Sequence, residues 1–207
     1  MVDRPAESDC EAFGDGFLGQ AANTTTSLAF VAAGVAILLA SRASHRSRTI
    51  YAVLAIGTGA GSVVFHGPAP SWAEPVHDLP LIALFAFVAA DAVSDLRGRP
   101  LSPAWWVLPP LVIVALAETT RIDSAPLEAV VAAAALVASV LRMRARPEHR
   151  QTILLAMLIL GAGALIGTLS RTGGPWCEPD SLLQGHAIWH VLAAVAVWRL
   201  APAIGQA

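Results

Sequence analysis

Residues 102–118 read SPAWWVLPPLVIVALAE, and the topology of the whole chain depends on this stretch. It is apolar but short, and Pro109 and Pro110 near its centre are expected to kink or break a helix. Prolines are nevertheless tolerated in membrane-spanning helices, because neighbouring groups satisfy the freed backbone atoms. If the stretch does not cross a membrane, every later helix runs in the opposite direction.

Six further apolar runs lie at about 22–41, 50–66, 77–95, 126–142, 151–170 and 183–200. Roughly 20 apolar residues are needed for a helix to cross a bilayer. Of the 207 residues, 56% are hydrophobic and only 14% are charged, well below the roughly 25% charged residues of a soluble domain. We therefore expect an all-α fold, in which residues 1–207 form a single integral membrane domain with seven transmembrane helices between about 22 and 200.

The arginines support counting residues 102–118 as a helix. The chain has no Lys, so all 13 basic residues are Arg. With seven spans, ten of the 13 lie on one face of the membrane, and 12 of the 15 acidic residues lie on the other. Positive charge marks the cytoplasmic face, so we expect the amino terminus outside and the carboxyl terminus in the cytoplasm. The ten are Arg42, Arg46, Arg48, Arg97, Arg99, Arg142, Arg144, Arg146, Arg150 and Arg199, whereas Arg4, Arg121 and Arg171 lie opposite.

The first 21 residues are polar and acidic, and we expect them to lie outside the membrane. They lack the basic start and apolar core of a cleaved signal peptide, so the first apolar run is expected to be a retained helix. Arginine without lysine, together with abundant Ala, Gly and Pro, is typical of a GC-rich bacterial gene. We therefore expect a multi-pass protein of the bacterial inner membrane.

Four histidines fall near the outer ends of the predicted helices: His66, His77, His186 and His190. His45 and His149 lie in the arginine-rich loops instead, where we expect them to be solvated. Three distant parts of the sequence thus bring imidazoles to one depth, toward the periplasmic face.

Spacing places these side chains on shared helical faces. Ser62 and His66 are four residues apart, as are His186 and His190. Ionisable groups at membrane depth usually face the bundle interior and mark function. Three imidazoles suit Zn²⁺, and a fourth position left to water is the catalytic arrangement. The alternatives are interhelical hydrogen bonds for the histidines, packing for Ser62, and a helix-dipole contact for Asp78.

Together these residues resemble a known family. The alkaline ceramidases, in the seven-helix superfamily that also contains the adiponectin- and progestin-type receptors, share Ser-xxx-His, an Asp of the third helix and a late His-xxx-His. Asp9-Cys10-Glu11 and Asn23-Thr24 look like two further motifs of that family. The resemblance implies zinc held by His66, His186 and His190, with Ser62 and Asp78 as catalytic residues. It also implies hydrolysis of ceramide or a related N-acyl lipid to a fatty acid and an amine.

Two features depart from the family pattern. His77 stands where the ceramidases have their Asp, and Asp78 is one residue further. We favour Asp78 as the base and expect His77 to support it from outside the ligand set, although His77 as fourth ligand or base stays open. The family's calcium site is depleted here, because only Asp9 and Glu11 remain among its carboxylates. An acidic solvated tail is therefore favoured over calcium.

The resemblance also implies a disulfide between Cys10 and Cys177, the only two cysteines of the chain. An oxidising compartment permits such a bond, and two free thiols are the alternative. The expected partner is a membrane lipid substrate, with no nucleic acid, and the oligomeric state is open. A lipid-sensing, receptor-like protein with structural zinc is the alternative function. A transporter is disfavoured, because polar groups gather at one end of the bundle only.

Overall fold

The computed structural model describes residues 7–41 and 46–206, so Arg4, Arg42 and His45 lie outside the described residues. Within these ranges the chain forms helices and no strand. The seven α-helices are α1 (Ala21–Ala40), α2 (Arg46–His66), α3 (Ala73–Arg97), α4 (Ala104–Thr120), α5 (Ala125–Ala145), α6 (Arg150–Leu169) and α7 (Gly185–Leu200). The predicted number of helices is therefore confirmed, and each predicted run overlaps one of them.

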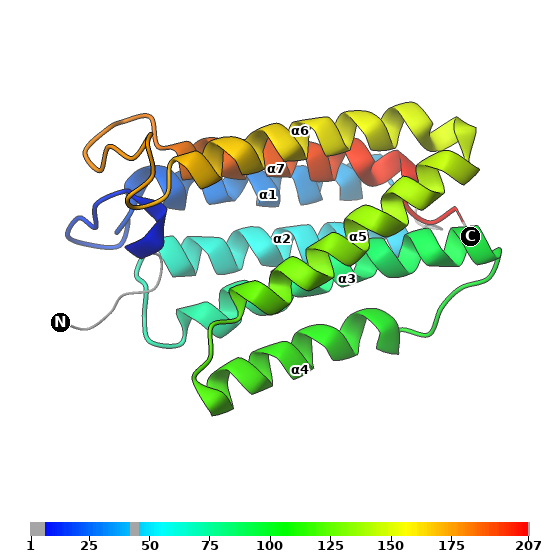
Figure 1. Cartoon of the computed structure of the whole chain (residues 1–207), viewed down its shortest axis with the longest axis horizontal. Coiled ribbons are helices and arrows are strands. Elements are labelled where there is room, and N and C mark those ends of the chain that lie inside the picture. Colours follow the sequence, from blue (N-terminus) through cyan, green and yellow to red (C-terminus); the bar gives the residue numbers. More distant parts are fainter. Residues whose placement is uncertain (1–6, 42–45, 207) are drawn as a thin grey trace.

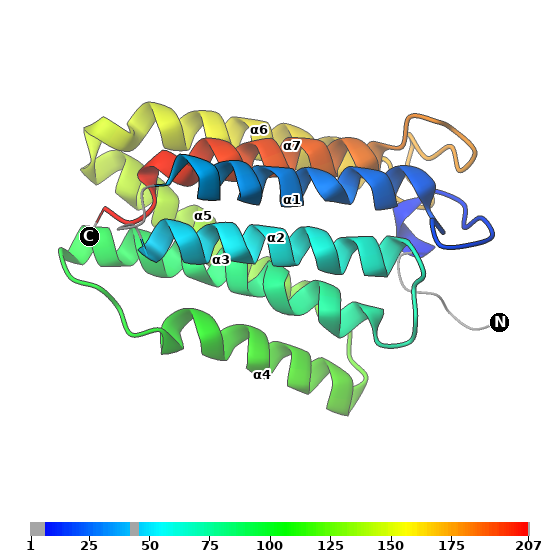
Figure 2. The ribbon, with the colours of Figure 1, turned by 180° about the vertical axis from the view of Figure 1, so that it is seen from behind.

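Five helices are long and apolar enough to cross a membrane: α1, α2, α3, α5, and α6 together with the 3₁₀ turn before it. Helix α4 is a shorter apolar helix of 17 residues, and α7 has 16 residues and continues into a 3₁₀ turn at Ala201–Ala203. The helices pack side by side with the two termini at opposite ends of the bundle (Figures 1 and 2). This arrangement is that of a helical membrane protein.

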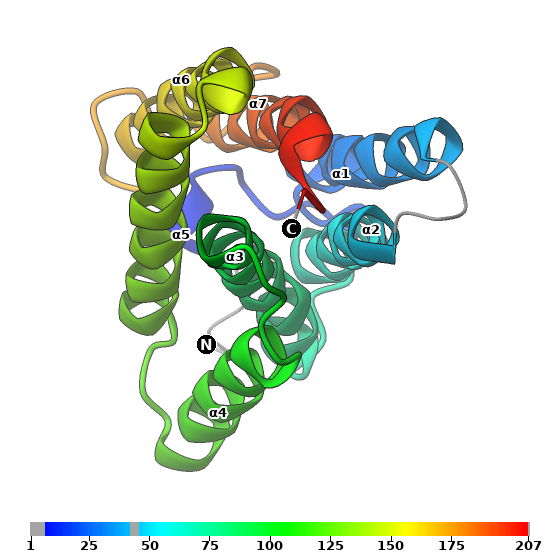
Figure 3. The same cartoon turned by 90° about the vertical axis from the view of Figure 1, so that its right-hand side faces the viewer.

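Six of the helices form a ring in which each contacts the next, in the order α1, α2, α3, α5, α6, α7 and back to α1. Helix α4 lies outside this ring and packs against α3, as the end-on view shows (Figure 3). It is unbroken from Ala104 to Thr120, although Pro109 and Pro110 lie inside it. The stretch that decided the topology is thus a real helix, but a peripheral one.

Helix α5 crosses obliquely between α3 and α6, so that it meets α6 near the η2 turn (Pro147–His149) and diverges from it toward the other end (Figure 1). A cavity of about 370 Å³ lies among α3, α5, α6 and α7. Its lining is almost wholly apolar and includes Leu84, Ala156, Leu160 and Trp189. The helices therefore border an apolar cavity that is partly open to the surroundings.

A buried ion network closes the end of the bundle that holds the carboxyl terminus. Arg142 is the last residue of the predicted run at 126–142, and in the structure it lies within the last turn of α5 and is only 2% exposed. Its guanidinium donates to Asp91 at 2.9 Å and to Asp95 at 2.8 Å. Gly205 donates its N–H to the other oxygen of Asp91 at 3.0 Å. The cost of burying these charges is offset because each lies against an opposite charge.

Candidate metal centre

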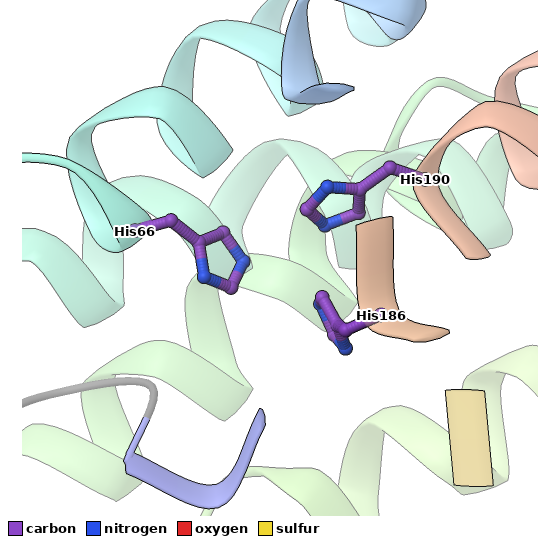
Figure 4. A group of neighbouring side chains, drawn as sticks. All are labelled: His66, His186 and His190. Atoms are coloured by element: carbon purple, nitrogen blue, oxygen red, sulfur yellow. The ribbon is translucent and has the colours of Figure 1, made fainter. Parts of the chain in front are cut away.

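Three histidines from two helices converge at the amino-terminal end of the bundle. His66 is the last residue of α2, whereas His186 and His190 occupy the first two turns of α7. One ring nitrogen from each lies within 4.8 Å of the nitrogens of the other two. Figure 4 shows the three rings turned toward a common centre, and their centroids are 4.6 to 5.0 Å apart. The spacing of four residues predicted in α7 does bring both of its rings to one site.

The outer nitrogen of each ring faces an oxygen of the protein. Nδ1 of His66 lies 2.7 Å from Oε1 of Gln20, and Nδ1 of His190 lies 3.1 Å from the carbonyl of Asn23. Nδ1 of His186 lies 3.3 Å from Oδ1 of Asp9. Carbonyl, amide and carboxylate oxygens accept hydrogen bonds, so these three contacts favour the tautomer in which Nδ1 carries the proton. Nε2 of each ring is then free to bind a metal.

Ser62 lies beside this centre and is buried. Its hydroxyl is 2.8 Å from that of Ser27 and 3.4 Å from Nε2 of His190, the nitrogen on the metal side. The preceding residue, Gly61, allows α3 to approach closely: a Cβ there would meet Cα of His77 at 2.9 Å and would overlap the carbonyl of Val76. Glycine at this position therefore brings the start of α3 against the end of α2.

His77 and Asp78 lie in the second turn of α3, which begins at Ala73 and not at His77 as predicted. The ring of His77 stacks on Phe65 and is 6.5 Å from that of His66. Asp78 accepts hydrogen bonds from Nδ1 of His77 at 2.8 Å and from the hydroxyl of Ser124 at 2.7 Å. Both oxygens of the predicted base are therefore engaged, one of them by His77, which faces the three-histidine cluster from outside it.

The segment Asp9-Cys10-Glu11, which precedes α1, is held against the loop between α6 and α7. Cys10 and Cys177 form the disulfide that the resemblance implied. Both carboxylate oxygens of Glu11 accept N–H groups at the start of α1, from Ala22 at 2.7 Å and from Asn23 at 2.8 Å. Glu11 therefore satisfies free backbone donors of that helix.

The two carboxylates that were predicted to bind calcium thus have different partners, because Glu11 caps α1 whereas Asp9 faces the histidines. The calcium prediction itself stays untested. Burial raises the pKa of the Asp9 carboxyl to about 6, although the charges of Arg171 and His77 act in the opposite direction. In the described residues, the three-histidine cluster is the one group of three or more potential ligands that is close enough to hold a metal ion.

The donor set fits a metal such as zinc. Three imidazoles with inward Nε2 atoms form a common ligand set for it, and an outer acceptor on each Nδ1 is the usual support. Sequence reasoning missed these outer acceptors, because it assigned no role to Gln20 and considered Asp9 only as a calcium ligand. Helical spacing carries no signal for either, because both lie outside the regular helices.

Comparison of the chain with protein-family models and with curated protein sequences gives no match.

Proposed function

We propose that this protein is a zinc-dependent hydrolase that cleaves the amide bond of an N-acyl lipid, most simply ceramide, to release a fatty acid and an amine. The observation that carries the proposal is the cluster of His66, His186 and His190, with three outer nitrogens on acceptors and three inner nitrogens convergent. Three histidines leave one position of a tetrahedral ion for water, which is the catalytic arrangement. The resemblance to the alkaline ceramidases supports the same reaction.

A lipid substrate is supported by the apolar cavity. Trp189, which lines it, is adjacent to the ligand His190, and Leu200 lines its far end on the same helix. Eleven residues of α-helix separate the two, a rise of roughly 16 Å. A cavity of this length and polarity suits a long acyl chain. The amide of the substrate would then lie beyond the Trp189 end of the cavity, toward the turns of α7 that carry the histidines.

When bound, zinc would lower the pKa of its water and polarise the amide carbonyl. Nε2 of each histidine would hold the ion, and the buried hydroxyl of Ser62 would donate to the oxygen of the carbonyl as it gains charge. Asp78 accepts a hydrogen bond from Nδ1–H of His77, which leaves Nε2 of His77 without a proton. Nε2 would therefore accept a proton from the attacking water and pass it to the leaving amine. The catalytic pair in this proposal is therefore His77 supported by Asp78.

We further propose the orientation that the arginines indicate. The carboxyl-terminal end of the bundle carries nine of the ten predicted cytoplasmic arginines, and Arg42 lies outside the described residues. Arg121 and Arg171 follow α4 and α6 at the opposite end. The metal centre would then face the periplasm of a bacterial inner membrane, where the disulfide is stable.

Two measurements on the purified protein test the function: zinc content, and release of fatty acid from labelled ceramide. We expect one zinc ion per chain and hydrolysis in the wild type, and loss of both in His186→Ala. The matched control is His149→Ala, which removes a histidine at the far end of the bundle. Zinc in the wild type without hydrolysis of any N-acyl lipid would contradict the enzyme proposal and favour a lipid-sensing protein with structural zinc.

A further inference from the structure

Asp9 belongs to a segment outside the helix bundle, yet its carboxylate is buried against the metal centre. Oδ1 lies 3.3 Å from Nδ1 of His186, and Oδ2 lies 4.0 Å from Nδ1 of His66. Both contacts are with outer nitrogens, so the carboxylate lies behind the rings and not at their convergent side. Asp9 is therefore placed to act on the histidines.

His186 needs this support more than the other two histidines. Its side chain is 16% exposed, whereas that of His66 is 1% exposed. It is also the second residue of α7, whereas His190 lies one turn further into that helix. His66 and His190 meet neutral oxygens, and His186 alone meets a carboxylate within 3.5 Å. A carboxylate behind a metal-binding histidine fixes its tautomer and raises its basicity.

Asp9 is held in place by the chain on both sides of it. The neighbouring Cys10 is bonded to Cys177 and donates its N–H to Oγ1 of Thr172 at 3.1 Å. Thr172 in turn donates its N–H to the carbonyl of Ser8 at 3.0 Å. Cys177 and Thr172 both belong to the loop that leads into α7, the helix of His186. The disulfide thus links the segment of Asp9 to the loop that leads into α7, the helix that carries His186.

We propose that Asp9 is a positioning residue of the metal centre, which holds Nδ1–H of His186 so that Nε2 faces the ion, and that the disulfide Cys10–Cys177 keeps Asp9 there. This inference rests on the proposed metal site. It assigns the extramembrane segment a direct effect on metal affinity. The disulfide then contributes to metal binding without either sulfur being a ligand.

Zinc affinity measured by competition with a chromophoric chelator tests the role of Asp9. We expect Asp9→Ala to weaken binding about 10- to 100-fold and Asp9→Asn, which keeps an accepting oxygen, to weaken it less. Asp15→Ala is the matched control, because it removes the same charge from an exposed position of the same segment. Equal affinities of Asp9→Ala and Asp15→Ala would overturn the inference. A wild type that binds no more zinc than His186→Ala would refute the metal site itself, a distinct result.

The role of the disulfide is tested by its non-additivity with Asp9. We expect Cys10→Ser/Cys177→Ser to weaken zinc binding in the wild-type background and to change nothing further in Asp9→Ala. An equal loss in both backgrounds would show that the disulfide acts independently of Asp9 and would overturn that part.

Cobalt absorption separates positioning from direct ligation. Co²⁺ bound to the wild type and to Asp9→Asn should give the same visible bands at saturation, because the ligand set is unchanged. A shift of the bands would make Asp9 a ligand and overturn its assignment as a positioning residue.

Discussion

Replacing Gln20 by methionine removes the acceptor behind His66 while keeping the length of the side chain. Both residues are fully buried, and Oε1 of Gln20 lies 2.7 Å from Nδ1 of His66. Loss of an outer partner of a metal-binding histidine costs about 10- to 100-fold in affinity, which corresponds to roughly 1.4–2.8 kcal/mol of binding free energy. The orphaned Nδ1–H also lowers the free energy of unfolding by about 1–3 kcal/mol.

The measurements are zinc affinity by chelator competition and thermal unfolding in the same detergent. Gln151→Met serves as the control, because Gln151 is exposed at the start of α6 and far from the site. Gln20→Glu retains an acceptor toward His66 and should keep more of the affinity than Gln20→Met does. If Gln20→Met binds zinc as tightly as wild type while His66→Ala does not bind it, Nδ1 is not the outer nitrogen and the assignment of Nε2 as ligand is wrong.

Substitutions test three other parts of the molecule: the buried ion network, the disulfide and the apolar cavity. Arg142→Met leaves Asp91 buried without its cation and leaves Asp95 only the partly exposed Arg146. The substitution should lower the free energy of unfolding by about 3–5 kcal/mol, measured by thermal unfolding. Equal unfolding temperatures for Arg142→Met and the exposed-site control Arg144→Met would contradict this. Cys10→Ser/Cys177→Ser removes a disulfide between residues that are 167 apart in the sequence, and it should lower the free energy of unfolding by about 2–4 kcal/mol. An unchanged unfolding temperature would contradict this. Ala156→Leu narrows the apolar cavity and should raise KM for long-chain amides but not for short-chain ones; an equal change for both would place the acyl chain elsewhere.

Much of the fold is predictable from the sequence because membrane helices are long apolar runs. The seven runs overlap the seven helices, and the Pro109-Pro110 stretch is a helix, as the arginine pattern favoured. That α4 crosses the membrane stays a prediction. The position of α4 outside the ring was not predictable, since hydropathy gives the length of a helix but not its neighbours. The burial of Arg142 was not predictable for a related reason: its partners Asp91 and Asp95 are about 50 residues away, and a charge at the end of an apolar run carries no sign of being buried.

The grouping of the three histidines with Ser62 was predictable, whereas the residues that contact the outer ring nitrogens were not. Spacing of four residues put Ser62 and His66 on one face and His186 and His190 on another, and the helix ends placed both pairs at one depth. Asp9 and Gln20 follow no periodicity, and a disulfide between residues 10 and 177 brings the segment of Asp9 to the site. Asp78 was predicted to be the base from the resemblance to the ceramidases. Its contacts with His77 and Ser124 could not be predicted from that resemblance.

Zinc K-edge X-ray absorption of the purified protein shows directly whether three histidines hold a zinc ion with one position left for water. We expect one zinc ion per chain with three imidazole nitrogens and one oxygen at about 2.0–2.1 Å, and loss of imidazole scattering in His190→Ala. A sulfur ligand, or a fourth imidazole from His77, would contradict it, because either would leave no place for a hydrolytic water.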